Sequence, residues 1–311
     1  MSGVSLTRHI RNRINRYYSP IEARLPTNWL LLLPGAVLLL VIVGVPLAAA
    51  ILLSFSTYNL TYSPQPTYSG PENYVVHVLG DGGFINATVN TVVFVAGAVG
   101  LEFLLGFAFA LLLWGQFRGR DAFRALLLTP MFVAPIAAGL TFRFLFDPQM
   151  GVVPHLLGFV GLGDIPWFSD PALAMLTIIV ADVWQWTPYM VVLLLAGLES
   201  LPAEPYEAAE IDGASTVDQF VEITLPLMRP VIAATLLIRI IDASKVFAKV
   251  YTMTSGGPGV ATETLAWYIY KVGFQFYHLG AAASQAVTVL LMIVGLGYVQ
   301  TYVIERSETY E

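Results

Sequence analysis

Long apolar stretches alternate with polar loops along the chain. The first, Trp29 to Leu53, has no charged residue over 25 positions, and about 20 suffice to cross a bilayer as a helix. Five similar stretches follow, at about Ala87–Trp114, Ala122–Phe146, Ala172–Gly197, Pro230–Tyr251 and Gly280–Ile304. Because each is a continuous apolar run rather than a short alternating one, the pattern predicts an all-α membrane protein with six transmembrane helices.

Positively charged residues are unevenly distributed among the loops, and this predicts the orientation. The tail before the first stretch and the loop after the second carry most of them: Arg8, Arg11, Arg13, Arg16, Arg24, Arg118 and Arg120. The loops at 54–86 and 147–171 contain no Lys or Arg, and the loop at 252–279 contains only Lys271. Since cytoplasmic loops are enriched in Lys and Arg, we expect both termini and the loop at 198–229 in the cytoplasm.

Three parts follow from these boundaries: a cytoplasmic tail at 1–28, a membrane domain at 29–304 with a cytoplasmic loop at 199–229, and a cytoplasmic tail at 305–311. Only 12% of the residues are charged and 57% are hydrophobic, whereas soluble domains average about 25% charged residues. The chain has no cysteine, which excludes disulfides and thiolate metal sites. A net charge of −6 gives no reason to expect nucleic acid as a partner.

Signatures of catalysis are missing from the sequence. No Gly-x-x-x-x-Gly-Lys-Ser/Thr phosphate loop is present, so the chain has no recognisable means of hydrolysing ATP. The four histidines show no metal-ligand spacing: they are His9, His77, His155 and His278. No nucleophile elbow or Ser/His/Asp order stands out. We therefore expect a transport subunit with no catalytic residue, cofactor or metal of its own, which disfavours a membrane enzyme.

The loop at 198–229 is acidic and patterned as two short helices. Its charged residues are Glu199, Glu204, Glu207, Glu210, Asp212, Asp218, Glu222 and Arg229. Pro205 suits a first helical turn, and the Glu-Ala-Ala-Glu run that follows favours helix. Gly213 can redirect the chain through a positive φ, and Ser215 with Asp218 matches a capping box. The pattern predicts a helix–glycine–helix elbow that docks a partner, rather than a disordered acidic linker.

The residues of this elbow resemble the EAA signature of bacterial and archaeal ABC importer permeases. Glu207-Ala208-Ala209 is followed after three residues by Gly213, and after nine more by Ile223-x-Leu225-Pro226. In that family the loop forms a coupling helix, which sits in a cleft of an ATPase subunit and transmits its motion. The resemblance implies that the ATPase contact involves Glu207, Ala208, Ala209, Asp212, Gly213, Leu225 and Pro226.

Other segments resemble the carbohydrate branch of these permeases. They are Trp184-x-Trp186-Thr187-Pro188, Leu195-Ala196-Gly197-Leu198, Thr254-Ser255-Gly256-Gly257-Pro258 and Thr262-Glu263-Thr264. The last two look like the first permease subunit of maltose- and glycerol-phosphate-type importers, and the resemblance extends over about residues 30–304. It implies a permease subunit of an ATP-driven, binding-protein-dependent importer for a sugar or oligosaccharide.

The resemblance also implies a set of partners. These are a second, homologous permease subunit, two ABC ATPase subunits that carry ATP and Mg, an extracytoplasmic substrate-binding protein, a sugar substrate and the lipid bilayer. The expected location is the prokaryotic plasma (inner) membrane, which the chain crosses several times. The expected mechanism is alternating access, in which one binding site is exposed to each side in turn.

Polar residues inside the fourth stretch mark a candidate substrate pathway. Asp182, Gln185, Trp186 and Tyr189 fall on one helical face near its middle, with Trp184 on a neighbouring face. Ionisable residues at membrane depth face a cavity or a partner. The rings are expected to stack on a sugar while the carboxylate and the amide bond its hydroxyls. Packing between helices is an equally weighted alternative.

The fifth stretch carries four charged residues, Arg239, Asp242, Lys245 and Lys249, which share one helical face within an arc of about 120° at 3.6 residues per turn. Arg239 and Asp242 are three residues apart and are expected to form a structural ion pair. Lys245 is expected to line the pathway. Glu102 has no predicted partner, so its role as a gate or as a packing contact stays open.

A second class of function fits the same polar residues. Asp182, Arg239, Asp242 and Lys245 could form a proton relay in an ion- or proton-coupled secondary transporter. Such a carrier would need no ATPase. Within the importer class, a polyol, a glycerol phosphate or an amino acid derivative is also open as the substrate, and the two cations at Arg239 and Lys245 keep an anionic cargo open.

Overall fold

The computed structural model describes residues 27–308, which divide into two compact units that are treated separately. The first unit ends at Leu53 and contains α2 (Thr27–Leu39), the π-helical turn η1 (Leu40–Gly44) and nearly all of α3 (Val45–Ser54). Together they form the first predicted span, observed at Leu31–Ser54. Residues 1–26 of the predicted tail at 1–28, and residues 309–311 of the tail at 305–311, lie outside the described residues.

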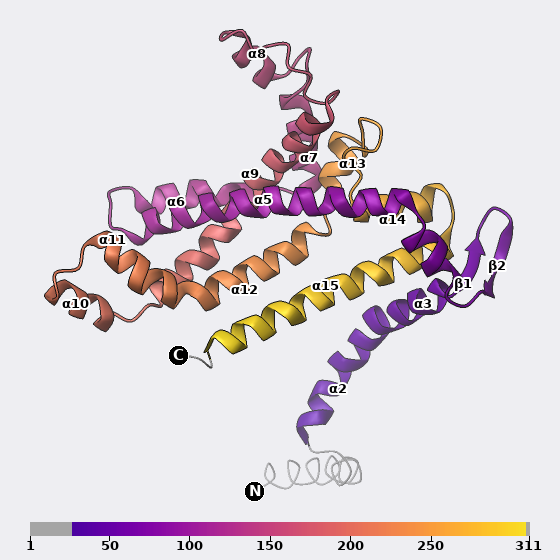
Figure 1. Ribbon diagram of the computed structural model, residues 1–311, viewed down its shortest axis with the longest axis horizontal. Coiled ribbons are helices and arrows are strands. Elements are labelled where there is room, and N and C mark those ends of the chain that lie inside the picture. Colours follow the sequence, from indigo (N-terminus) through magenta and orange to yellow (C-terminus); the bar gives the residue numbers. More distant parts are fainter. Residues whose placement is uncertain (1–26, 309–311) are drawn as a thin grey trace, which may run out of the picture. The chain divides into compact units, whose positions relative to one another are not determined.

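Helices make up most of the second unit, which starts at Ser54 (Figure 1). Its elements are β1 (Ser56–Asn59), β2 (Ser63–Tyr68), α4 (Glu72–Tyr74), η2 (Val75–Leu79), α5 (Gly82–Trp114), α6 (Arg120–Leu128), η3 (Thr129–Phe132), α7 (Pro135–Leu145), α8 (Val152–Gly158), α9 (Pro171–Glu199), α10 (Glu204–Ile211), α11 (Thr216–Gln219), η4 (Phe220–Thr224), α12 (Leu225–Ala243), α13 (Ala248–Met253), α14 (Leu265–Tyr270), η5 (Lys271–Gln275) and α15 (Leu279–Glu308). The helical character is as predicted. An antiparallel β1–β2 hairpin, which pairs Ser56 with Tyr68, adds strand structure that the all-α prediction lacks.

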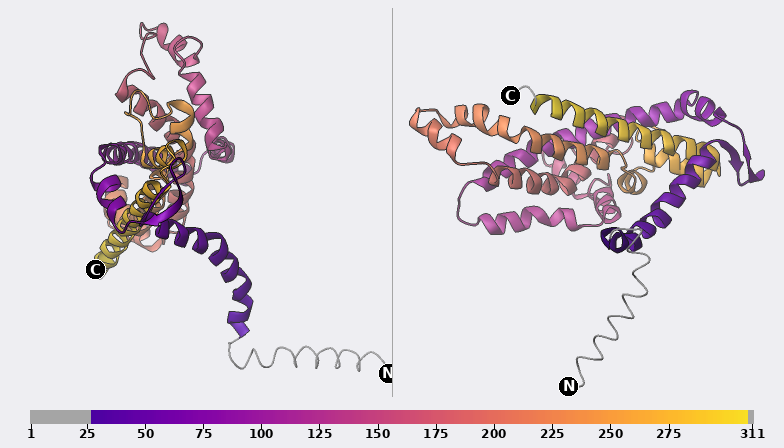
Figure 2. Two further views of the ribbon diagram at one scale, coloured as in Figure 1. Left: turned by 90° about the vertical axis from the view of Figure 1, so that its right-hand side faces the viewer. Right: turned by 90° about the horizontal axis from the view of Figure 1, so that it is seen from below.

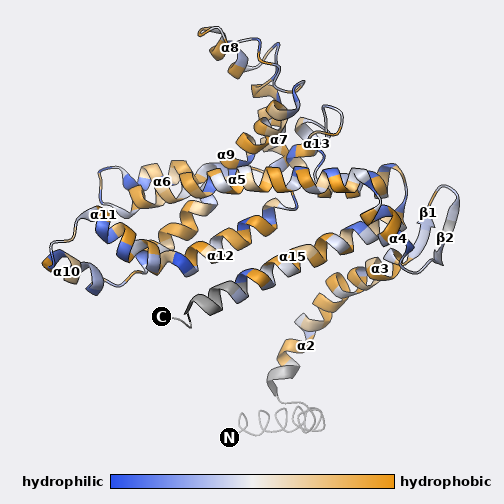
Figure 3. Ribbon diagram, in the orientation of Figure 1, coloured by the Kyte–Doolittle hydropathy of each residue, from blue (hydrophilic) through white to orange (hydrophobic). Residues whose placement is uncertain are grey.

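Within the described part of the chain, five helices are long and apolar enough to cross a membrane, and a bent pair makes a sixth span if counted as one. The five are Leu31–Ser54, Gly82–Trp114, Pro171–Glu199, Thr216–Ala243 and Leu279–Gln300. Figure 3 shows apolar residues predominating along α5, whereas hydrophilic residues gather around α10 and α11. The chain is therefore an integral membrane protein whose helices follow the apolar stretches of the sequence.

The predicted third span, Ala122–Phe146, is bent in the structure. Helix α6 ends at Leu128 and continues into the turn η3, which ends at Phe132. Helix α7 then begins at Pro135 with its axis turned by 97°. Proline is favoured in the first turn of a helix because it lacks an N–H, and it disfavours helical geometry in the residue before it. The third predicted span is therefore present as a bent pair of helices rather than as one continuous helix, and α7 packs against α13 (Figure 1).

The predicted fifth span, Pro230–Tyr251, is also misplaced. The apolar helix starts at Thr216 and stops at Ala243, and Lys249 lies on the separate helix α13. At the break, the Ser244 hydroxyl donates to the Ile240 carbonyl at 2.7 Å, a local bond that competes with helical continuation. The prediction that all four charged residues of this stretch share one helical face is therefore wrong.

Helices α5 and α9 form the tightest pair of the second unit. A Cβ atom added at Gly106 of α5 would lie 2.6 Å from the Cβ of Met190 on α9, so the glycine allows the two backbones to approach closely. Helix α12 packs against both of them, and it also runs beside α15 in Figures 1 and 2. This arrangement brings the polar residues of α5, α9 and α12 into one region of the interior.

Candidate functional site

The loop between α9 and α12 folds as the elbow that its sequence predicts, and we refer to residues 204–219 as the elbow. Pro205 lies in the first turn of α10, and Gly213 has a φ of +77°. Ser215 and Asp218 form a reciprocal capping box at the start of α11. These predicted local features are confirmed, whereas the coupling role of the elbow stays a prediction.

One aromatic contact and a hydrogen bond connect the elbow to the helices, and a second aromatic contact follows directly after it. The Tyr206 hydroxyl lies 2.9 Å from the Thr224 hydroxyl, and the Tyr206 ring meets the Trp114 ring edge-on, with centroids 6.0 Å apart. Phe220 packs on Phe107 of α5, with centroids 5.9 Å apart. The elbow and the residue that follows it are therefore in contact with α5 and with the turn η4 that leads into α12.

The surface of the elbow combines acids with exposed apolar side chains. Ile211 is 86% exposed, and the acids Glu207, Glu210 and Asp212 beside it are also exposed. Exposed apolar groups rimmed by charges are typical of protein–protein contact sites. The elbow therefore has the composition of a docking surface.

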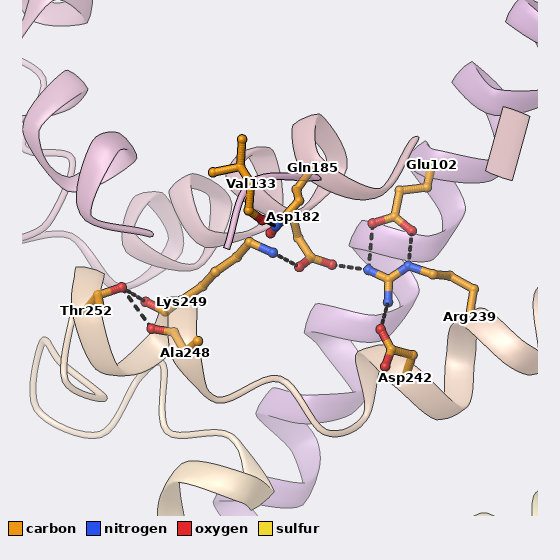
Figure 4. Close-up of polar contacts among 9 residues, drawn as sticks. All are labelled: Glu102, Val133, Asp182, Gln185, Arg239, Asp242, Ala248, Lys249 and Thr252. Carbon is orange, nitrogen blue, oxygen red and sulfur yellow. Dashed lines mark hydrogen bonds and ion pairs between the residues drawn. The ribbon is translucent and has the colours of Figure 1, made fainter. Parts of the chain in front are cut away.

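Four buried charged residues from four helices form a charge cluster: Glu102 of α5, Asp182 of α9, Arg239 of α12 and Lys249 of α13 (Figure 4). Arg239 donates from Nε and Nη2 to the two carboxylate oxygens of Glu102, at 2.6 and 2.9 Å. Its Nη2 also donates to Asp182 Oδ2. Lys249 Nζ donates to Asp182 Oδ1 at 2.6 Å. The cluster therefore connects α5, α9, α12 and α13 through charged hydrogen bonds.

Burial explains why these four residues occur together. Each of them is at most 2% exposed, and an uncompensated charge at such a position costs several kcal/mol. The two carboxylates and the two cations cancel one another. The predicted ion pair of Arg239 with Asp242 is also present, at 3.2 Å. Glu102, which had no predicted partner, is bound more closely to Arg239. The two residues are 137 positions apart in the chain, so no local signal connects them.

A pair of cavities lies at the edge of the charge cluster. Their volumes are about 330 and 380 Å³, and both are lined by Trp186, Asp242 and Lys245. Asp182 and Arg239 border the first and Tyr189 borders the second. These volumes fall within the range of small-molecule pockets, about 300–1,000 Å³. The structure thus brings five of the eight predicted pathway residues to one cavity, and Tyr189 to the cavity that shares its lining.

Trp186 connects the cavities to the charge cluster. Its ring lies 5.4 Å from the Arg239 guanidinium carbon and 5.9 Å from Lys249 Nζ, which is the range of cation–π attraction. The Tyr189 ring meets it edge-on, with centroids 6.2 Å apart. The ring of Trp186 is therefore held in place by charged and aromatic neighbours.

The two remaining predicted pathway residues lie elsewhere. Gln185 is fully buried and donates from its amide nitrogen to the Val133 carbonyl at 2.5 Å. Trp184 packs against Phe142, with centroids 5.4 Å apart, and lines a different cavity together with Pro188. Whether these residues contact substrate stays a prediction, but neither lines the cavities beside the charge cluster.

Two of the four histidines, which the sequence places far apart, meet next to the β1–β2 hairpin. The rings of His77 and His278 have centroids 6.4 Å apart, and the Tyr62 hydroxyl lies 3.0 Å from His278 Nε2. Burial, followed by the proximity of His278, lowers the pKa of His77, and the carboxylates of Asp81 and Glu72 partly oppose this change. Protonation of the His77 imidazole is therefore less favourable in the folded protein than in the unfolded chain.

Comparison with known proteins connects this geometry to a family. The chain is 36% identical over 282 residues to the trehalose/maltose transport system permease protein MalF of Thermococcus litoralis, covering 90% of this chain and 93% of that one. It is also 36% identical over 263 residues to the sulfoquinovosyl glycerol transport system permease protein SmoG of Agrobacterium fabrum, covering 85% of each chain. The sn-glycerol-3-phosphate transport system permease protein UgpA of Yersinia pestis is 30% identical, with 94% of this chain and all of that one covered.

Solved structures share the fold. The crystal structure of a bacterial ABC transporter involved in the import of the acidic polysaccharide alginate superposes with a TM-score of 0.78 at 21% identity, over 94% of this chain and 99% of that one. The model of the family described as binding-protein-dependent transport system inner membrane component matches residues 102–308. That range holds the charge cluster, the cavities and the elbow. The chain therefore belongs to the family of binding-protein-dependent transport system inner membrane components, the permease subunits of ABC transporters.

Proposed function

We propose that this chain is one of two permease subunits of an ATP-driven sugar importer, and that its sugar passes Trp186, Tyr189, Asp242 and Lys245. The observation that carries this proposal is the pair of cavities in which two aromatic rings meet an accessible carboxylate and an accessible ammonium group. Family membership supports import driven by a separate ATPase. The names of the relatives, which include a trehalose/maltose permease, support a saccharide as the cargo.

Sugar recognition requires both kinds of lining group. Hydroxyl groups that leave water need hydrogen-bond partners, since an unpaired polar group in an apolar site is costly. The Asp242 carboxylate can accept from them, and the Lys245 ammonium can donate to them. The faces of Trp186 and Tyr189 supply apolar surface for the C–H face of a sugar ring. Asp182 and Arg239 are assigned a structural role, because their charged groups bond mainly to each other and to Glu102 and Lys249.

The elbow is assigned the contact with the ATPase. Its exposed acids and its exposed Ile211 suit a cleft that offers cations and an apolar pocket. Two ATPase subunits with such a cleft would bind ATP and Mg. The positive charge of the loop between α5 and α6 supports a cytoplasmic location for that loop, and with it for the elbow and both termini. A second, homologous permease and an extracytoplasmic binding protein complete the proposed transporter.

The family is one of non-enzymatic permeases, with the ATPase on separate subunits, so this chain is a transport component and not an enzyme. Membership also favours this function over the ion-coupled carrier that the intramembrane charges first allowed. The buried charges have another explanation in the structure, because they pair with one another across four helices.

Uptake by the complete transporter in proteoliposomes tests the proposal. Radiolabelled mono-, di- and trisaccharides would be supplied with the binding protein outside and ATP inside. We expect uptake of a saccharide only when both are present. Uptake driven by an ion gradient without ATP would contradict the proposal, and so would a transporter that accumulates none of the saccharides. Mass spectrometry of the co-purified chains would identify the ATPase and the second permease independently.

A further inference from the structure

We infer that the sugar carries no net charge: the pathway is built for a neutral saccharide and not for a uronate, a sugar phosphate or a sulfonate. This inference rests on the proposed function and names the class of its substrate. Family membership does not decide the matter, because the relatives are named for trehalose and maltose as well as for sn-glycerol 3-phosphate. The deciding feature is the way charges are paired around the two cavities.

The guanidinium of Arg239 is already bonded to carboxylates inside the protein through four of its five N–H donors. The Arg239 guanidinium donates from Nε and Nη2 to Glu102, from Nη2 to Asp182 and from Nη1 to Asp242. Its side chain is 1% exposed. A guanidinium is the group best suited to hold a carboxylate, phosphate or sulfonate by paired hydrogen bonds. Here that capacity is used inside the protein, so Arg239 cannot act as the receptor for an anionic cargo.

Lys249 is engaged in the same way. Its ammonium group donates to Asp182 at 2.6 Å, and its side chain is 3% exposed. To bind an anion, Lys249 would have to give up its hydrogen bond to Asp182 and hold a further negative charge close to that buried carboxylate. Among the residues that line the two cavities, this leaves Lys245 as the accessible cation.

Lys245 has an acidic neighbour that is equally accessible. Its Nζ lies 3.9 Å from Asp242 Oδ1, and the two side chains are 58% and 51% exposed. An anion drawn to Lys245 would therefore approach the Asp242 carboxylate at a similar distance, and the repulsion would offset much of the attraction. The anion would also lose its hydration without compensation.

Charge balance over the whole lining supports the same conclusion. The carboxylates of Glu102, Asp182 and Asp242 lie beside the cations of Arg239 and Lys249 (Figure 4). The ammonium group of Lys245 adds a third cation next to Asp242. The sum of these six charges is zero. A neutral sugar adds no charge to this balance. Its hydroxyls can use the remaining acceptor and donor sites of Asp242 and Lys245.

Two variants that change a pathway charge, and one control variant, test this inference. Asp242→Asn leaves the lining one unit more positive, and Lys245→Gln leaves it one unit more negative, with little change of shape. Asp164→Asn is the matched control, since Asp164 is exposed in the loop before α9 and lines neither cavity. Each complete transporter would be supplied with pairs of saccharides that differ by one carboxylate, such as methyl glucoside with methyl glucuronide, and longer saccharides with their uronates.

The measured quantity is the ratio of neutral to anionic uptake, and the same binding protein is used throughout so that its own preference cancels between variants. Binding of each pair to the permease–ATPase complex without the binding protein gives the permease's own preference. We expect wild type to bind and take up the neutral member preferentially. The ratio should fall at least about tenfold in Asp242→Asn and should rise in Lys245→Gln, whereas Asp164→Asn should match wild type.

Each outcome distinguishes the inference from the function on which it rests. Wild-type binding of uronates as good as that of their neutral partners would overturn the inference but leave a sugar importer. A ratio that does not respond to the two pathway variants would overturn it as well. If the complex takes up no saccharide of either charge, the proposed function itself fails, and the inference fails with it.

Discussion

The charge cluster and the elbow are both rich in carboxylates, yet the two regions use them in opposite ways. Glu102 and Asp182 are buried, and each accepts hydrogen bonds from a buried cation. Glu207 and Glu210 of the elbow are exposed on a short helix. Buried carboxylates hold helices together only while their cations are present, whereas exposed ones cost little and remain available to a partner.

We therefore expect changes in the two regions to have different effects, one on the stability of the protein and the other on its function. Changes in the charge cluster should reduce the stability of the protein, because α5, α9, α12 and α13 meet there. Changes in the elbow should leave the helices intact and reduce communication with the ATPase. Changes at Trp186 should affect both stability and transport, since its ring contacts the charge cluster and lines a cavity of the proposed pathway.

The largest effect is expected from Arg239→Ala. It leaves Glu102 and Asp182 with one cation between them, and breaking a buried ion pair in this way costs about 3–5 kcal/mol. The yield of monodisperse protein and the thermal unfolding midpoint in detergent should both fall sharply. Arg118→Ala, at an exposed arginine between α5 and α6, is the matched control and should behave like wild type.

A double variant sharpens this prediction. Glu102→Gln combined with Arg239→Gln removes one charge of each sign and leaves Asp182 paired with Lys249. Part of the lost stability should return, since replacing both partners avoids an unpaired buried charge. If Arg239→Ala is as stable as wild type, the charge cluster does not hold the helices together, and the contrast with the elbow fails.

Gly213→Val should produce the next largest effect, and here uptake should fall while the stability of the protein is largely retained. Valine is strained at a φ of +77°, where a non-glycine residue costs about 1–3 kcal/mol. The turn between α10 and α11 should rearrange, so that ATP hydrolysis continues while uptake falls at least about tenfold. Insertion and thermal stability should stay close to wild type.

Gly119→Val provides the matched control for the elbow. Gly119 also has a positive φ, of +87°, and an added Cβ meets no atom within 4 Å at either glycine. The strain is therefore similar, but the site lies between α5 and α6. Uptake per ATP hydrolysed should be unchanged in this variant. Normal uptake in Gly213→Val, or equal uncoupling in both, would remove the evidence for a coupling elbow.

The elbow could be predicted closely because its signals are local. Pro205 indicates a helix start, Gly213 indicates a turn with positive φ, and Ser215 with Asp218 indicates a cap three residues apart. Each signal depends on neighbours within about one helical turn. The structure agrees on all of them. The partner that would dock there leaves no such trace in a single chain, so that assignment rests on resemblance.

The charge cluster could be predicted only in part, because it depends on contacts between distant helices. Asp182 and Arg239 could be recognised as charges at membrane depth. Because they are 57 positions apart on different helices, however, the sequence does not indicate that their side chains meet. The prediction of one straight helix placed Lys249 on α12, whereas the break after Ala243 puts it on α13, where it reaches Asp182. Hydropathy shows which residues are apolar enough to lie in the membrane, but it does not show whether their helix axis is continuous. For the same reason, the bend before Pro135 was not predicted.

Trp186→Ala tests a residue that both contacts the charge cluster and lines the proposed sugar pathway. The variant removes an aromatic face from both cavities, together with the cation–π contacts to Arg239 and Lys249. Uptake should show an apparent affinity for sugar lowered roughly fivefold to tenfold, or about 1–1.4 kcal/mol, with assembly on the ATPase retained. Trp184→Ala, on the same helix but outside these cavities, should have a smaller effect. Equal effects of the two would argue against sugar stacking on Trp186.

The smallest effect concerns pH at the β1–β2 end, where His77 is neither fully buried nor freely exposed. Burial lowers the pKa of His77 in the folded protein, so the folded state favours the neutral imidazole. Its stabilisation is complete above the unfolded pKa of about 6.5 and is lost as the pH falls through the lowered folded value. The thermal midpoint should therefore drop modestly between pH 7.5 and 5.5, and this drop should shrink in His77→Gln but persist in His155→Gln on α8. A pH response that is unchanged by His77→Gln would show that the partly buried imidazole does not contribute to it.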